Sequence, residues 1–255
     1  MGKTEQYVSK LDGKSVSNWT LADSFEVGRW LAKIFVGILM KEATVSLDRR
    51  KPEFGSIFPV EATGELYLLH LLIQSWRKVI LFRAVHTEHP FTLYVYEIEE
   101  DTDFGSFNFS TNIPGKSVCI RFGTLGFAFV GDGGLQHEAG NGGPFRLAFQ
   151  KIHPVQFDEI AARVHYKASL RSATHSYFHE EDATSLRFQQ MEVIPYSKNN
   201  LADGSDRIFR DWSDKDLAHF FKLYNVPRWD VLVDPSGSAS FTRLVDSTGR
   251  KIDFF

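Results

Sequence analysis

Two histidines that stand four residues apart are the first candidates for chemistry in this chain. His175 and His179 are followed directly by Glu180, Glu181 and Asp182. If a helix runs through them, both imidazoles lie on one face, where they could bind Zn²⁺ or Mn²⁺ in a metal-dependent hydrolase or nuclease. The glutamate of the H-E-x-x-H motif is missing. We therefore favour a histidine pair without a metal, and keep a metal site at His175 and His179 as the alternative.

Three consecutive cations are the best candidates for contact with nucleic acid. Arg49, Arg50 and Lys51 follow Asp48 in a polar stretch. The whole chain carries a net charge of −3 and has an isoelectric point of about 6.3, so affinity for phosphate would depend on this local triplet. We favour a solvated turn, and keep a nucleic-acid-binding accessory domain that uses these three residues as the alternative.

Complete catalytic motifs are missing from the sequence. The single cysteine, Cys119, lies in the middle of a strand-like stretch, where a packed and inert thiol is the usual outcome. Two Gly-Lys-Ser triplets, at 13–15 and 115–117, lack the earlier glycine that a phosphate-binding loop needs. The glycine-rich stretch 131–134 lacks the third glycine of the dinucleotide fingerprint. We expect neither catalytic residues nor a cofactor.

The stretch from residue 91 to 134 forms the framework that would position any site. Apolar residues alternate there with polar or small ones, which sends neighbouring side chains to opposite faces of short strands. The alternating apolar positions are Phe107, Phe109, Ile120, Phe122, Phe127 and Phe129. Turn sequences such as Asn-Ile-Pro-Gly and Gly-Thr-Leu-Gly separate the strands and predict an antiparallel meander. We interpret the 23 phenylalanines as an aromatic core rather than as a surface that stacks on bases or sugars.

Helical patterns flank the meander on both sides. Apolar residues at helical spacing predict helices over 23–42, 64–76, 155–173 and 213–223. Pro154 suits the first turn of the third helix, because a missing N–H costs nothing there. The stretch 174–212 fits no single pattern, and the tail resembles a hairpin that turns at 235–237. The fold class predicted from these elements is α+β, an antiparallel β-meander with helices packed on it.

One core is expected between the first helix and the meander. Apolar faces turn inward by default, so the side chains that repeat at helical or strand spacing should be mostly buried. They are Trp30, Ile34, Phe35, Leu69, Phe107, Phe109, Ile120, Phe127 and Phe129.

Length and composition indicate an ordinary globular protein. The chain has 255 residues, of which 43% are apolar and 24% charged. We predict an irregular N-terminal arm over 1–22, a main α+β domain over 23–195, and a helix with a β-hairpin over 196–255 in the same domain. The first residues lack the apolar core of a signal peptide, and the longest apolar run, 34–40, is too short to span a membrane. We expect a cytoplasmic protein without a membrane partner.

Three stretches of the sequence occur in an order that matches a known pattern. They are the helix-like stretch 30–42, the basic turn 47–52, and the strand 126–134 that ends in Gly-Asp-Gly-Gly. In this order they resemble the C-terminal region of uncharacterised bacterial proteins that often begin with a zinc-finger or HNH-nuclease-like module. The C-x-x-C pairs and the His-Asn-His arrangement are missing here, so the resemblance implies an accessory domain without its nuclease. The leading hypothesis is a non-enzymatic binding module of bacterial or phage-like origin, with a protein or a nucleic acid as its partner.

Overall fold

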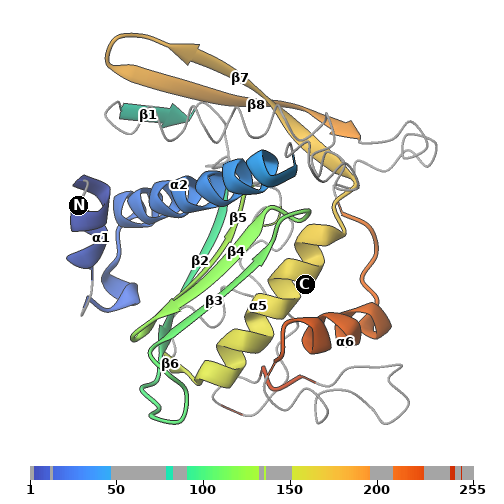
Figure 1. Ribbon diagram of the computed structural model, residues 1–255. Helices are drawn as coiled ribbons and strands as arrows, with labels where there is room; N and C mark the ends of the chain where they lie inside the picture. Colours follow the sequence, from blue (N-terminus) through green and yellow to red (C-terminus); the bar gives the residue numbers. More distant parts are fainter. Residues whose placement is uncertain are drawn as a thin grey trace.

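A computed structural model describes residues 3–11, 14–46, 79–82, 91–131, 135, 151–195, 209–226, 242–244 and 248. Across these residues the fold is α+β, as the sequence predicted: helices pack against a mostly antiparallel, open five-stranded sheet (Figure 1). The predicted helix over 64–76 and the predicted hairpin turn at 235–237 lie outside the described residues, and so does Leu69.

The five-stranded sheet has the order β3-β4-β5-β2-β6. Its strands are β2 (Thr92–Ile98), β3 (Phe107–Asn112), β4 (Ser117–Phe122), β5 (Leu125–Val130) and β6 (Lys151–Ile152). Strands β3, β4 and β5 form the predicted meander, and β2 pairs antiparallel with β5 on its far side. Only β6 runs parallel to its neighbour within this sheet, next to the end of β2. Strand β3 is therefore an edge strand.

Two tight turns hold the meander together. Gly123 and Thr124 connect β4 to β5, and Gly123 has a φ of +56°, a conformation that side chains other than glycine rarely adopt. A four-residue loop from Ile113 to Lys116 connects β3 to β4, and the Lys116 N–H donates to the Ile113 carbonyl over 3.0 Å. These are the turns that the sequence predicted.

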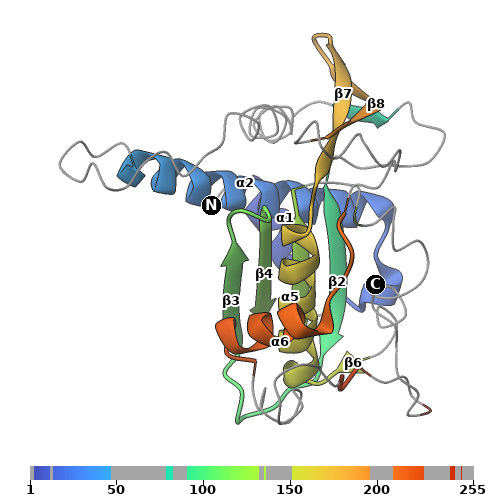
Figure 2. The same cartoon turned by 90° about the vertical axis from the view of Figure 1, so that its right-hand side faces the viewer.

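Helix α2 (Leu21–Ser46) covers one face of the sheet. It begins with a capping box, because the Thr20 N–H donates to Asp23 Oδ2 over 2.7 Å while the Asp23 N–H donates to Thr20 Oγ1 over 3.2 Å. The view in Figure 2 shows α2 crossing the strands and continuing past β3. This helix corresponds to the first predicted helix, extended at both ends.

The N-terminal residues are more ordered than the sequence predicted. They contain α1 (Lys3–Ser9) and the 3₁₀ turn η1 (Val16–Asn18), so the expectation of an irregular structure is wrong for these stretches. Tyr7 Oη and Lys14 Nζ donate to the buried Asp23 carboxylate over 2.5 and 2.8 Å. Because these contacts come from single polar residues, they leave no periodic signal in the sequence.

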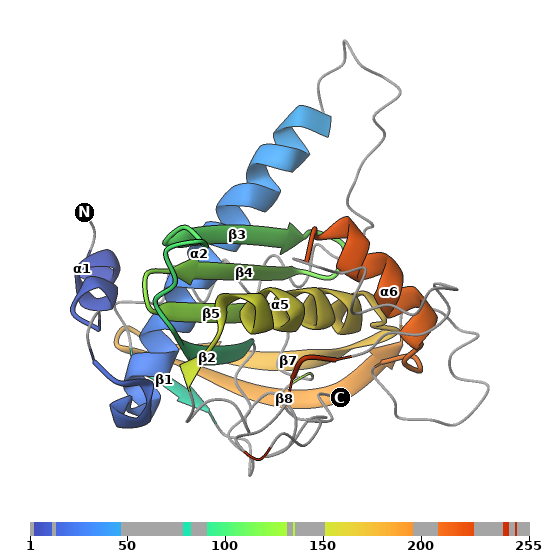
Figure 3. The ribbon, with the colours of Figure 1, turned by 90° about the horizontal axis from the view of Figure 1, so that it is seen from below.

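Helix α5 (Pro154–Ser169) covers the opposite face of the sheet, and α6 (Asp214–Leu223) packs on α5 (Figure 3). His153 caps α5: its side chain accepts from the Val155 N–H, and the Gln156 side chain accepts from the His153 N–H over 2.9 Å. Pro154 occupies the first turn, as predicted. The helix ends at Ser169 rather than at residue 173.

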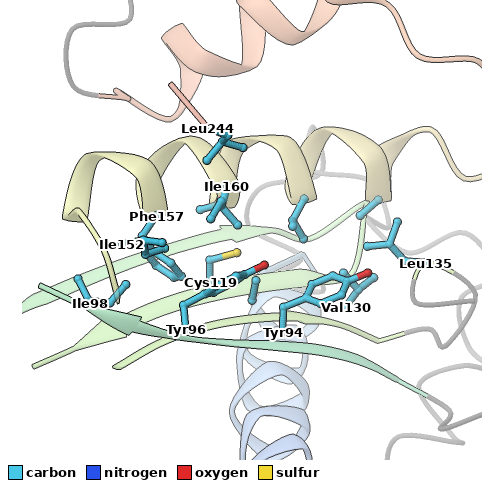
Figure 4. Packing of buried hydrophobic residues seen from close by; sticks show 14 of the residues in the cluster. Tyr94, Tyr96, Ile98, Cys119, Val130, Leu135, Ile152, Phe157, Ile160 and Leu244 are labelled. Atoms are coloured by element: carbon cyan, nitrogen blue, oxygen red, sulfur yellow. The ribbon is translucent and has the colours of Figure 1, made fainter. Parts of the chain in front are cut away.

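Three apolar clusters fill the spaces between these layers. The first lies between α2 and the sheet, the second between the sheet and α5 (Figure 4), and the third between α5 and α6. Of the residues predicted to form the core, Phe35, Ile120, Phe127 and Phe129 are buried, and Trp30 and Ile34 are partly buried. The prediction is wrong for Phe107 and Phe109, which are exposed.

A second, three-stranded sheet has the order β1-β8-β7. Its strands are β1 (Val79–Phe82), β7 (Ala173–Glu181) and β8 (Ser185–Pro195), with β1 parallel to β8 and β7 antiparallel to it. His175 and His179 lie on β7. The helix that would have placed both imidazoles on one face is therefore absent at these two positions, and that premise of the metal-site hypothesis is wrong.

Candidate functional site

Strand β3 turns its polar side chains inward and its phenylalanines outward. On the face toward α5, Asn108 Nδ2 donates to Asp158 Oδ1 over 2.7 Å, and Ser110 Oγ lies 2.9 Å from His165 Nε2. Phe107 and Phe109 are the residues between these polar positions, so their side chains leave on the opposite face, the one toward α2. The usual arrangement, with apolar residues inside and polar residues outside, is reversed in this strand.

The polar face of β3 is held by a fully buried histidine. His165 Nδ1 lies 2.7 Å from Ser117 Oγ, and the imidazole stacks on the Tyr224 ring with 4.5 Å between centroids. The carbonyl of His165 accepts from Asn112 Nδ2 over 2.9 Å. Both ring nitrogens and the backbone of His165 are thus satisfied by β3 and β4.

A serine beside a histidine could in principle form a nucleophile and its base. Burial, however, lowers the pKa of His165 to about 3. Placing a proton on this imidazole at pH 7 would therefore cost about 5 kcal/mol, at about 1.4 kcal/mol for each pH unit. We conclude that Ser110, His165 and Ser117 hold β3 against α5 and are not set up for base catalysis.

A second polar group lies where β3 and β4 meet the first half of α5. Burial raises the pKa of Asp158, while the hydrogen bond from Asn108 opposes that rise. Arg121 Nη1 donates to the Gly105 carbonyl over 2.6 Å, and Arg121 Nε finds no partner among the described residues. These groups, like His165, fix the orientation of β3.

Three phenylalanines form an exposed patch on the α2 side of β3 and β4. Phe107 is 60% exposed, Phe109 is 38% exposed and Phe122 is 61% exposed. Phe107 lies directly opposite Phe122 in the ladder, and Phe109 lies beside it on the same strand face. We call Phe107, Phe109 and Phe122 the phenylalanine patch. Exposed clusters of large apolar side chains mark surfaces where another molecule binds.

The backbone of the same residues faces the open edge of the sheet. The Gly123 N–H donates to the Ser106 carbonyl over 2.7 Å, which places position 106 among the residues that bond with β4. Hydrogen-bonded and non-bonded pairs alternate in an antiparallel ladder, so the N–H and C=O groups of Phe107 and Phe109 point away from β4. Tyr224 Oη reaches the Thr111 carbonyl from that outer side, at 3.2 Å, which agrees with this assignment.

The edge also lacks the devices that usually keep edge strands apart. Charged residues, prolines and bulges normally discourage pairing with another chain. The run from Phe104 to Gly115 contains no charged residue, and its one proline, Pro114, stands in the turn after β3. The pairing of β3 with β4 runs without a register shift. An uncharged, regular strand with exposed apolar side chains is therefore open for pairing.

The residues singled out by sequence have mixed outcomes. The side chains of His175 and His179 lie outside the described residues, but on a strand their Cα atoms are about 13 Å apart, at 3.3 Å per residue. Arg49, Arg50 and Lys51 are not described. Where the chain is described, no group of three or more His, Cys, Asp or Glu side chains could hold a metal ion. The metal site and the phosphate contact stay predictions.

Cys119 is the packed thiol that its position predicted. It is buried under α5, and burial raises the pKa of its thiol well above the ordinary value (Figure 4). A thiol held in its protonated form is a poor nucleophile.

Comparison of the chain with protein-family models, with curated proteins and with solved structures found no match. None of the described helices is both long and apolar enough to cross a membrane. The resemblance to nuclease-linked bacterial proteins stays a prediction.

Proposed function

We propose that this chain is a protein-binding module and that β3 is the strand it presents to its partner. An extended segment of the partner adds to the sheet beside β3 and continues the hydrogen-bonded ladder. One observation carries the proposal: Phe107 and Phe109 supply both exposed aromatic side chains and outward-pointing backbone groups. A segment that pairs with their backbone brings its own alternate side chains onto the phenylalanine patch.

The charges around β3 favour a polypeptide over a nucleic acid. Glu99, Glu100, Asp101 and Asp103 lie in the loop that leads into β3, and they would repel phosphate. On the patch face, β3 and β4 contribute only uncharged side chains. Arg121, the one cation of these two strands, is buried on the other face. Aromatic stacking on bases would lack the cations that normally accompany it.

A short, blocked peptide of alternating valine and threonine is a suitable probe of the edge. We expect the protein at low concentration to bind this peptide and to slow hydrogen exchange at the Phe107 and Phe109 amides. The amides of Asn108 and Ser110, which already bond with β4, should change little. A peptide with N-methylated amides should not bind, because it cannot continue the ladder.

Phe109→Pro is the variant that separates backbone pairing from non-specific stickiness. It removes an outward N–H without breaking the β3–β4 ladder, and proline is tolerated where the N–H of an edge strand faces solvent. Loss of one or two hydrogen bonds worth about 1 kcal/mol each should weaken peptide binding about tenfold. Equal binding by Phe109→Pro, or no protection of the Phe107 amide, would show that β3 is not the binding strand.

A further inference from the structure

If β3 is the binding strand proposed above, its partner still has to be named. We infer that the segment it binds is β3 of a second copy of this chain. The two strands run antiparallel about a two-fold axis that passes near Phe109, perpendicular to the sheet. The two five-stranded sheets then become one continuous sheet across the interface.

The chemistry of β3 suits pairing with itself. A two-fold axis places each residue opposite itself or opposite a near neighbour, so a strand with charges would meet like charges. The run from Phe104 to Gly115 contains no charged residue, although 24% of the chain is charged. A partner with a basic or acidic segment would find no complementary charge on this strand. Phe109, by contrast, would lie beside Phe109 of the second copy, as aromatic pairs prefer.

The position of α2 gives the second reason. Figures 2 and 3 show α2 crossing the sheet and extending beyond the β3 edge, on the face that carries the phenylalanine patch. Burial of α2 against its own sheet ends near Val36: Gly37 is exposed, and a Cβ placed there would meet no atom within 4 Å. Ile38 continues the apolar face of Leu31 and Phe35 into this overhang.

The two-fold axis brings this overhang over the neighbouring copy. The axis is perpendicular to the sheet, so both copies keep their α2 helices on the same side. The last turns of each α2 then extend over β3 and β4 of the other copy, on the face of the phenylalanine patch. One arrangement therefore accounts for the open edge, the uncovered phenylalanines and the helix that extends beyond its own sheet. An unrelated peptide would account for only the first two.

Sedimentation velocity over a range of concentrations tests the inference directly. We expect a dimer that dissociates on dilution, and slower exchange of the Phe107 and Phe109 amides in the dimer than in the monomer. Phe109→Lys and Phe109→Glu should each be monomeric, because the axis brings like charges together. An equimolar mixture of the two variants should form dimers again. Circular dichroism and thermal unfolding confirm that each variant is folded.

Phe178→Ser is the matched control. Phe178 is 53% exposed on β7, so the substitution removes an equally exposed phenylalanine without touching β3. It should leave the monomer–dimer equilibrium unchanged.

Three results would overturn the inference. A wild-type chain that is monomeric at every concentration but binds the valine–threonine peptide has the proposed binding strand with a different partner. A monomeric chain that does not bind the peptide refutes the proposed function as well. A dimer that survives in Phe109→Lys, with rapid exchange at Phe107, forms through another surface.

Discussion

Phe127 and Phe129 on β5 and Phe107 and Phe109 on β3 lie on the same face of one sheet, yet the first pair is buried and the second is exposed. The residue type and the alternation are the same in both strands. The difference lies in what covers them. Trp19 and Trp30 pack on Phe127 with 6.2 Å between ring centroids.

Phe129 is enclosed in the same way. Its ring centroid lies 6.3 Å from that of Phe35 on α2 and 5.7 Å from that of Phe91, next to β2. Two strands further out, β3 lies where the described chain places no comparable aromatic cover. The comparison shows that position in the sheet, not the local sequence, decides whether an alternating phenylalanine belongs to a core or to a surface.

The largest expected effect is on the buried side of this comparison. Phe129→Ala should lower the free energy of unfolding by about 3 to 5 kcal/mol, because the lost transfer energy adds to the cost of a cavity. Urea denaturation followed by circular dichroism measures the change. A loss below about 1 kcal/mol would mean that the α2 layer closes over the space, and the contrast between β5 and β3 would weaken.

Acid should act on the polar face of β3 through His165. Its pKa of about 3 in the folded chain lies below the 6.5 of an ordinary imidazole, so between these values the unfolded chain binds the extra proton. Stability is therefore complete above pH 6.5 and falls as the pH drops toward 3, by about 1.4 kcal/mol per pH unit from this group.

Denaturant unfolding at a series of pH values isolates this contribution when wild type is compared with His165→Gln. The variant should be less stable at pH 7 but should lose less stability between pH 6 and pH 4. The remaining histidines and carboxyl groups titrate in both proteins, so they cancel in the difference. Parallel pH profiles would show that His165 is not the neutral, buried group described above.

The smallest expected effect on stability is at the exposed side. Phe107→Ser should change the free energy of unfolding by no more than about 0.5 kcal/mol, since the side chain is largely in solvent. The same substitution should weaken peptide binding and dimer formation, measured by titration and sedimentation. A stability loss comparable to that of Phe129→Ala would show that Phe107 belongs to the core after all.

The sequence predicted the helices and the meander well, because both depend on local patterns. The apolar spacing of α2, the proline at the start of α5 and the turns around β4 each identify one element without reference to its neighbours. The N-terminal helix α1 escaped prediction, since it is held by single polar contacts such as that between Tyr7 and Asp23.

The candidate site could not be predicted in the same way. Alternation shows that Phe107 and Phe109 share a face, but not that this face is uncovered. That depends on the sheet order, in which β2 pairs with β5 and leaves β3 at the edge. The four-residue spacing of His175 and His179 is equally ambiguous, because positions four apart share a face in a helix and in a strand. Only the uncharged run from Phe104 to Gly115 could have indicated an edge strand open to pairing.

The packing of α2 on β5 also has a consequence for synthesis on the ribosome. Ser46 ends the helix and Val130 ends the strand, and at about 5 to 20 residues per second the roughly 85 residues between them take several seconds to translate. During that delay the apolar side of α2 has no β5 to cover it. We expect nascent chains stalled in this interval to bind chaperones, and chains stalled once β5 has emerged to be released.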